Sequence, residues 1–303
     1  MEIIKSETHY NFVAMMKIAV TISVVYILIG IASIFWHGGL NFGIDFAGGT
    51  LIQIRFSGET SVDKLRQALK PIGMDSSIIQ QFGPKEMVVR TAVASTDLKG
   101  ISSQLENTLN MAYGQSGYEI RRLETVGPKV GRDLTRKALL AIIFSWIGIL
   151  VYVGFRFEFR YALGGIIALV HDILVTMGTL SLLNKEFDLN IVAAFLTIIG
   201  YSINDTIVIF DRIRENTRKN MKMPLMDVIN LSVNQTLSRT ILTSFTVFMV
   251  LLVLFFFGGA VIHDFAFALL VGCVAGVYST VFIASPIVLL FEKIRPSGMK
   301  RKK

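Results

Sequence analysis

Two ionisable residues lie inside or beside stretches of sequence that are otherwise apolar. Asp205 falls within the run 189–210, and Arg239 stands at the head of the run 240–257. A charge inside a bilayer is costly and marks a functional site by default. An acid and a base placed there form either a site at which charge moves or a fixed ion pair that ties two helices together, and both interpretations stay open.

The depth of these two residues can be estimated from helix geometry. Asp205 lies about 16 residues, roughly 24 Å, from the outer end of its run, and Arg239 lies about 18 residues, roughly 27 Å, from the outer end of the next. We therefore expect them at similar depth on adjacent helices, with polar stripes that face the bundle interior or a water-filled cavity. The polar neighbours at helical spacing are Tyr201, Asn204 and Thr243.

A second ionisable pair, His171 and Asp172, lies near the middle of the apolar run 162–183. The pair could relay a proton. Small residues at four-residue spacing around Asp172 also suit close helix packing, so a structural role stays open. Gly272 and Gly276 form a Gly-x-x-x-Gly face, which predicts helix packing.

Composition places these residues in a membrane protein. The chain has 303 residues, of which 52% are hydrophobic and 17% charged, and its mean hydropathy is +0.59. Six apolar runs are long enough to cross a hydrocarbon core of about 30 Å as helices. The only cysteine, Cys273, excludes an intrachain disulfide and suggests no thiolate metal site. The predicted spans are 18–36, 138–155, 162–183, 189–210, 240–257 and 265–291.

The distribution of Lys and Arg predicts the orientation. Basic residues flank one set of span ends, whereas the opposite short loops hold few, so both termini are expected in the cytoplasm. The net charge of +8 then indicates attraction to anionic lipids and not to nucleic acid. We predict a cytoplasmic N-terminus and first span over 1–36, read as a retained anchor, an amphipathic segment along the inner membrane surface near 212–238, and a basic tail over 293–303.

The polar stretch 37–137 is predicted to fold outside the membrane, before the membrane part 138–292. Its periodicity indicates strands at 49–56, 77–82, 87–91 and 118–126, and helices at 62–69 and 98–112. This order of elements is that of a ferredoxin-like α+β domain. It shows no metal-ligand cluster, nucleophile elbow or phosphate loop, so we expect a binding or mechanical module, no enzyme activity and no cofactor.

Two glycine-rich stretches flank this domain. They serve either as turns that need glycine's backbone freedom or as hinges through which the domain swings. The hinge candidates are Gly43, Gly48, Gly49, Gly127, Pro128 and Gly131.

Several strings together resemble the signature of the SecF branch of the SecD/SecF protein-export family. They are GIDFAGG (43–49), VGPKVG (126–131), the His-Asp pair, GYSINDTIVIFDRIREN (200–216) and NQTLSRTILTS (234–244). The family resembles the resistance-nodulation-division (RND) transporters. The resemblance implies a six-span half that pairs with a six-span SecD-like subunit in the bacterial cytoplasmic (inner) membrane. It also implies use of the proton motive force to promote late steps of export of unfolded polypeptide from the SecYEG channel, with Asp205 and Arg239 in proton transfer.

Two other function classes stay open at this point. The first is an RND-type proton-coupled transporter half for lipids or hydrophobic small molecules, and the second is a membrane scaffold without ion transport. An outer domain of about one hundred residues offers no sign of the paired domains that build a substrate duct, which argues against the first. The intramembrane charges argue against the second.

Overall fold

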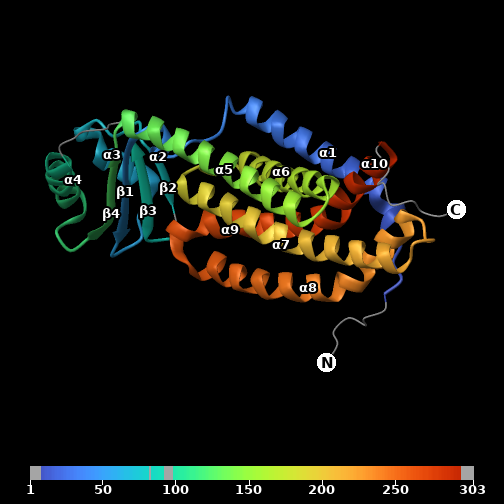
Figure 1. Cartoon of the computed structure of the whole chain (residues 1–303). Helices are drawn as coiled ribbons and strands as arrows, with labels where there is room; N and C mark the ends of the chain where they lie inside the picture. Colours follow the sequence, from blue (N-terminus) through green and yellow to red (C-terminus); the bar gives the residue numbers. More distant parts are fainter. Residues whose placement is uncertain (1–7, 82, 92–97, 295–303) are drawn as a thin grey trace. The chain divides into compact units, whose positions relative to one another are not determined.

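The computed structural model of the chain describes residues 8–81, 83–91 and 98–294. Lys5, Phe82 and the basic tail from residue 295, which entered the predictions above, lie outside these residues. The chain divides into two compact units, one formed by Met1–Asn41 with Leu140–Lys303 and the other by Phe42–Leu139 (Figure 1). Each unit has its own hydrophobic core.

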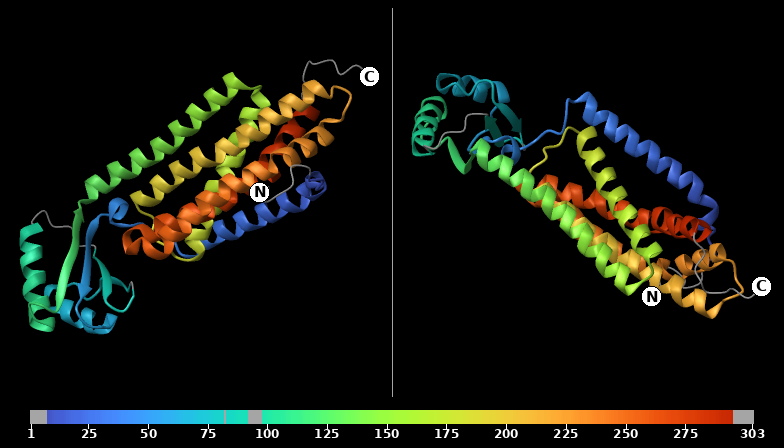
Figure 2. Two further views of the ribbon diagram at one scale, coloured as in Figure 1. Left: turned by 90° about the horizontal axis from the view of Figure 1, so that it is seen from below. Right: turned by 45° about the horizontal axis from the view of Figure 1, so that its top comes forward.

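Six helices among the described residues are long and apolar enough to cross a membrane, which confirms the predicted number of spans. Five are single helices: α1 (Phe12–Trp36), α5 (Pro128–Arg156), α6 (Phe159–Leu182), α7 (Leu189–Lys219) and α8 (Leu225–Phe257). The sixth span is composite, because α9 (Gly259–Ser279) passes through a π-helical turn, η2 (Thr280–Ala284), into α10 (Ser285–Ile294). The helices run side by side in the views of Figures 1 and 2.

Small residues let these helices approach closely, as packing in a membrane requires. Gly30 of α1 meets Gly178 of α6 so tightly that a Cβ on Gly30 would lie 2.7 Å from the Gly178 Cα atom. Gly272 and Gly276 of α9 pack against Ile198 and Ser202 of α7 in the same way. The Gly-x-x-x-Gly face therefore has the packing role that the sequence predicted.

The segment near 212–238, predicted to be amphipathic, takes in the end of α7, a short loop and the start of α8. Helix α7 continues to Lys219, and α8 runs without a break from Leu225 to Phe257. Its first turns are held by the chain's own N-terminal segment: the Asn230 Oδ1 atom accepts a hydrogen bond from the Phe12 N–H at 2.9 Å. The side chain of Asn234 likewise accepts from the Tyr10 N–H and donates to the Tyr10 carbonyl, both at 2.9 Å. Three residues of the apolar face that the sequence assigned to the membrane surface, Leu225, Ile229 and Val233, are buried in the hydrophobic core of the first unit.

The second unit is a four-stranded antiparallel sheet with two helices, as predicted. Strands β1 (Gly49–Phe56), β2 (Ile78–Gln81), β3 (Glu86–Thr91) and β4 (Tyr118–Val126) lie in the order β2-β3-β1-β4. Helices α3 (Val62–Leu69) and α4 (Leu98–Tyr113) complete the order strand, helix, strand, strand, helix, strand. This arrangement confirms the ferredoxin-like fold.

One face of the sheet forms the core of this unit. Ile52 and Ile54 of β1 pack with Leu65 of α3 and Leu105 of α4, and all four side chains are 0% exposed. The alternation of apolar and polar residues in β1 puts its apolar set on the helix side. The short helix α2 (Ile44–Ala47) and the lone turn η1 (Lys70–Ile72) connect the larger elements.

Candidate functional site

Asp205 is a buried carboxyl group in the middle of helix α7. Its side chain is 4% exposed, and its Oδ2 atom accepts a hydrogen bond from the Ser244 hydroxyl of α8 at 3.3 Å. Tyr201, one helical turn earlier on α7, accepts a contact of 3.4 Å at its hydroxyl from the Cys273 thiol of α9. Asp205 thus lies where α7, α8 and α9 pack together, as an intramembrane acid with few fixed partners.

Sequence reasoning identified Asp205 and Tyr201 but missed Ser244 and Cys273. Ser244 follows the predicted partner Arg239 by five residues and so falls outside the stripe expected to face Asp205. Cys273 was considered only for disulfide and metal chemistry. A search for small polar residues at helix-packing spacing within the spans could have found both.

Arg239 does not lie opposite Asp205. No hydrogen bond or ion pair joins the two side chains in the described part of the chain, although the charges are close enough to interact through space. Since Ser244 is the residue in contact with Asp205, Arg239 lies five residues, about 7.5 Å along the helix axis, away from that level. The two residues expected at similar depth are therefore offset by about five residues along α8.

Arg239 instead forms an exposed polar stripe with Thr243, one turn later on α8. Asn204 of α7 is exposed as well. The Thr243 hydroxyl donates to the Arg239 carbonyl at 2.9 Å and so serves its own helix. Polar side chains on the outer face of membrane-spanning helices need a polar neighbour or water, so this stripe marks a surface that lipid tails would not cover well.

Asp172 occupies a different and fully buried place in helix α6. Its side chain is 0% exposed. The Oδ2 atom accepts hydrogen bonds from Ser202 of α7 at 2.6 Å and from Ser279 of α9 at 2.9 Å, and the Oδ1 atom lies 3.0 Å from the His171 Nδ1 atom. Ser279 immediately precedes the π turn η2, where the sixth span changes its helical geometry.

His171 and Asp172 thus form the centre of a polar network that joins four helices, because His171 also contacts Ser23 of α1 at 3.0 Å. The sequence left a relay role and a packing role open for them. The structure shows close helix packing around Asp172. It also shows a series of hydrogen bonds around His171 and Asp172 that helix packing alone does not require. Ser202 links the network to the Asp205 region, because the two residues lie three positions apart on α7.

The two glycine-rich stretches meet inside the second unit. A Cβ on Gly131 would lie 2.8 Å from the Phe46 carbonyl oxygen, and one on Gly48 would lie 3.2 Å from the Pro128 Cα atom. Gly48 and Gly49 have positive φ angles of 79° and 132°, which other residues rarely adopt. Turn geometry or close backbone approach thus requires glycine at Gly48, Gly49 and Gly131, and a hinge role for the two stretches stays a prediction. Gly43 is the N-cap of α2, and Gly127 adjoins the start of α5.

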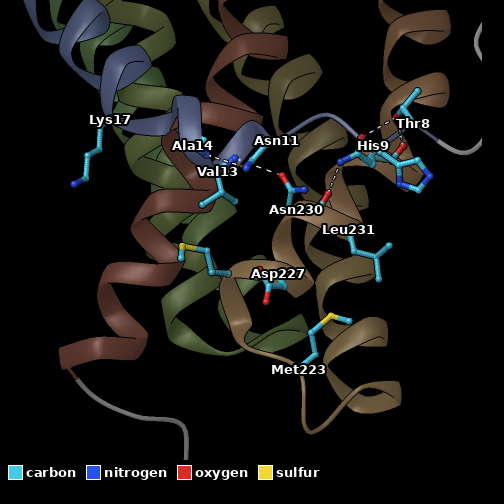
Figure 3. Close-up of a pocket in the computed structure, with 12 residues that line it drawn as sticks. Thr8, His9, Asn11, Val13, Ala14, Lys17, Met223, Asp227, Asn230 and Leu231 are labelled. Atoms are coloured by element: carbon cyan, nitrogen blue, oxygen red, sulfur yellow. Dashed lines mark hydrogen bonds between the residues drawn. The ribbon is translucent and has the colours of Figure 1, made fainter.

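Within the residues described, no group of three or more His, Cys, Asp or Glu side chains gathers as metal ligands would. A cavity of about 610 Å³ lies between the N-terminal segment and the start of α8, lined by His9, Lys17, Asp227 and Asn230 among others (Figure 3).

Comparison with known proteins places these features in a family. The profile described as protein export membrane protein SecD/SecF, C-terminal, matches residues 105–294, and the SecD/SecF GG motif matches residues 34–59. The protein translocase subunit SecF of Magnetococcus marinus is 47% identical over 306 residues, covering 100% of this chain and 97% of the relative. The corresponding subunit of Vibrio alginolyticus is 44% identical, covering 95% and 91%.

A solved structure gives the same result in three dimensions. The crystal structure of SecDF, a translocon-associated membrane protein from Thermus thermophilus, is similar with a TM-score of 0.86 and 34% sequence identity. The match covers 96% of this chain but 40% of the SecDF chain, so this chain spans less than half of that protein. With profile, relatives and structure in agreement, the chain belongs to the SecD/SecF family of protein export membrane proteins.

Proposed function

We propose that the chain is a proton-driven subunit of the Sec protein translocase that promotes late steps of protein export across the bacterial cytoplasmic membrane. It acts without enzymatic chemistry and without a cofactor. The observation that carries this proposal is the buried Asp205 carboxyl inside a spanning helix, with the Arg239 charge nearby but not paired to it.

This arrangement suits a group that gains and loses a proton. A carboxylate in an ion pair with Arg would stay ionised, whereas a desolvated carboxyl without that pair favours its neutral form. A movement that brings Arg239 one helical turn closer to Asp205 would therefore release the proton of the Asp205 carboxyl. One charge crossing 100 mV supplies about 2.3 kcal/mol, which is enough to shift a two-state equilibrium with a gap of a few kcal/mol.

The exposed polar stripe supports a partner subunit. Asn204, Arg239 and Thr243 would face lipid if the chain acted alone, and an Arg facing lipid in a spanning helix is unfavourable, by up to about 2.5–3.5 kcal/mol at the helix centre on insertion scales. A second six-span chain of SecD type with a carboxylate beside Arg239 would remove the free-energy cost of exposing Arg239 to lipid. The relative that matches in structure, SecDF, is larger than this chain, in keeping with such a pairing.

The remaining partners follow from the same proposal. The SecYEG channel delivers the emerging unfolded polypeptide, and the outer ferredoxin-like unit contacts it. Both termini lie in the cytoplasm. Basic residues near the inner ends of the spans then contact anionic lipid headgroups. The glycine-rich stretches 43–49 and 126–131 are the hinges at which the outer unit moves.

The test is proton flux and protein export in vesicles that contain this chain, its SecD-like partner and SecYEG. Asp205→Asn and Arg239→Met should each abolish flux that depends on an unfolded secretory polypeptide. The matched control is Asp211→Asn, which removes an exposed carboxylate from the same helix, and it should leave flux unchanged. Wild-type flux and export in both intramembrane variants would refute proton coupling at this site.

A further inference from the structure

His171 lies at the junction of α1, α6 and α9, and both of its ring nitrogens have partners. Its Nδ1 atom lies 3.0 Å from the Asp172 carboxylate, and its Nε2 atom lies 3.0 Å from the Ser23 hydroxyl of α1. The ring stacks on Tyr278 of α9 with an interplanar angle of 19°. The side chain is 6% exposed, so water replaces none of these contacts easily.

The direction of each hydrogen bond follows from the number of protons available. Tyr278 has one hydroxyl proton, and it goes to the Ala19 carbonyl at 2.6 Å because a carbonyl only accepts. Ser23, at 3.3 Å from the Tyr278 hydroxyl, must then donate its single proton in that bond. Ser23 therefore has no proton left for His171, and the Nε2 atom must be the donor in its contact with Ser23.

The same count applies on the other side of the ring. The Asp172 Oδ2 atom accepts hydroxyl protons from Ser202 and Ser279, and its Oδ1 atom shares one hydrogen bond with the His171 Nδ1 atom. With Nε2 protonated, all bonds of the chain are made at once only when the His171–Asp172 pair holds one further proton, on Nδ1 or on the facing Oδ1. Loss of one proton from Nε2 turns Ser23 toward His171 and breaks the Ser23–Tyr278 bond, and with it a link between α1 and α9.

We propose that His171 is a proton-binding site in the middle of the membrane, separate from Asp205, with the Asp172 carboxylate as its counter-charge. The bound proton makes an imidazolium–carboxylate pair of zero net charge, which a membrane interior tolerates better than a single charge. Asp172 acts as the positioning residue. The other titratable side chains at this junction are Tyr26 of α1, Tyr278 of α9 and, one turn from Ser202, Asp205 of α7, whereas α8 contributes the apolar Phe248.

A cavity beside the His171 imidazole ring gives protons access to the site. This cavity of about 450 Å³ is lined by His171, Ser23, Tyr26, Thr179 and Tyr278 together with apolar residues of α9. Beyond it, hydroxyl pairs continue along the contact of α1 and α6: Tyr26 with Thr179 at 2.9 Å, then Ser33 with Ser181 at 3.0 Å. These groups lead from the end of α1 near His37 toward His171.

The binding of a proton at His171 does not depend on export. Only its consequence rests on the proposed function. Protonation of His171 would stabilise the contacts of α1 with α6 and α9 next to Asp205. Proton binding at His171 and proton binding at Asp205 would then be coupled through Ser202. A direct measurement of the His171 protonation state therefore separates failure of this proposal from failure of the proposed function.

The chain has four histidines, so selective ¹⁵N-histidine labelling of the full chain in lipid nanodiscs gives a readable NMR spectrum. His171→Gln assigns the signal. Because charge-assisted hydrogen bonds are stronger than neutral ones, Asp172→Asn should lower the proton affinity of His171 at least about tenfold, which corresponds to about 1.4 kcal/mol. Ser23→Ala, a smaller change in case Asp172→Asn does not fold, should lower it about threefold by removing the acceptor of the Nε2 proton.

The protein contains a matched control. His263 and Asp264 repeat the same local pair, with Nδ1 and Oδ1 at 2.9 Å, but they are about a quarter exposed, and Asp264 also binds Lys185 at 2.8 Å. Asp264→Asn should therefore change the proton affinity of His263 less than about threefold. The proposal is overturned if His171 stays a neutral imidazole at every pH at which the chain is folded. It is also overturned if Asp172→Asn affects His171 no more than Asp264→Asn affects His263, or if Ser23→Ala has no effect.

Discussion

The contact of α1 with α6 at Gly30 and Gly178 makes a sharp test of the packing that positions His171. In Gly30→Ala the new methyl group would lie 2.7 Å from the Gly178 Cα atom. Ordinary carbon–carbon contact needs about 3.5–4.0 Å, so the helices must separate by about 1 Å. No side-chain rotation relieves the clash, because the atom in contact belongs to the backbone.

The magnitude follows from two opposing terms. Overpacking of this kind costs about 1–3 kcal/mol, whereas replacing Gly by Ala within a helix gains about 1 kcal/mol of helix propensity. Gly148→Ala supplies the control, because Gly148 lies within helix α5 and nothing lies within 4 Å of its added Cβ. The difference between the two variants cancels the propensity term and should be about 1–3 kcal/mol.

Unfolding by SDS in mixed micelles, followed by circular dichroism, measures this difference. The same 1 Å separation would lengthen the Ser23–His171 contact of 3.0 Å beyond hydrogen-bond distance, so the His171 NMR signal should also move in Gly30→Ala and not in Gly148→Ala. Equal stability of the two variants would refute the close helix contact and, with it, the geometry assigned to the His171 network.

Three further predictions concern the outer unit. Gly131→Ala places a Cβ 2.8 Å from the Phe46 carbonyl oxygen and should destabilise this unit by about 1–3 kcal/mol relative to Gly148→Ala. Hydrogen exchange of the β1 amides measures this difference. Equal exchange rates in the two variants would contradict the close approach of the two glycine-rich stretches. Leu105→Ala leaves a cavity at a side chain that is 0% exposed and should lower the stability of the unit by about 2–5 kcal/mol in the same measurement. A loss of stability below about 1 kcal/mol would contradict the core packing assigned to Leu105. Burial raises the pKa of Tyr113 above its usual 10.0 and outweighs the hydrogen bond with Thr60, so the folded unit favours the neutral phenol. The stabilisation of the unit that comes from this pKa shift is fully present below pH 10.0 and is lost as pH rises through the pKa of Tyr113 in the folded unit. Tyr113→Phe should therefore reduce the loss of hydrogen-exchange protection at alkaline pH.

The local elements of this protein could be predicted from periodicity. Strand β1 over 49–56, helix α3 over 62–69 and strand β4 over 118–126 have the predicted bounds, since each shows an uninterrupted alternation or helical repeat between turn residues. The element order then led to the ferredoxin-like fold, and long apolar runs led to six spans. These features depend on a residue's neighbours in the sequence.

The helix boundaries between α7 and α8 could not be predicted in this way. An apolar face over 225–237 suits a membrane surface or a protein contact equally well, and the chain buries Leu225, Ile229 and Val233 of this face in the core of the first unit. Nothing within that segment of sequence tells the two apart, because both surroundings bury the same side chains.

By itself, the sequence determined that an acid and a base lie within spanning helices, that a His-Asp pair lies within another, and which family motifs they belong to. Only the tertiary structure decided which side chains meet them: Ser244 at Asp205, and Ser202, Ser279 and Ser23 around Asp172 and His171. The level at which two helices face each other depends on loop lengths and on the close fit of small residues such as Gly30, Gly178 and Gly276. A shift of one turn moves every cross-helix contact by about 5.4 Å, more than a hydrogen bond can span.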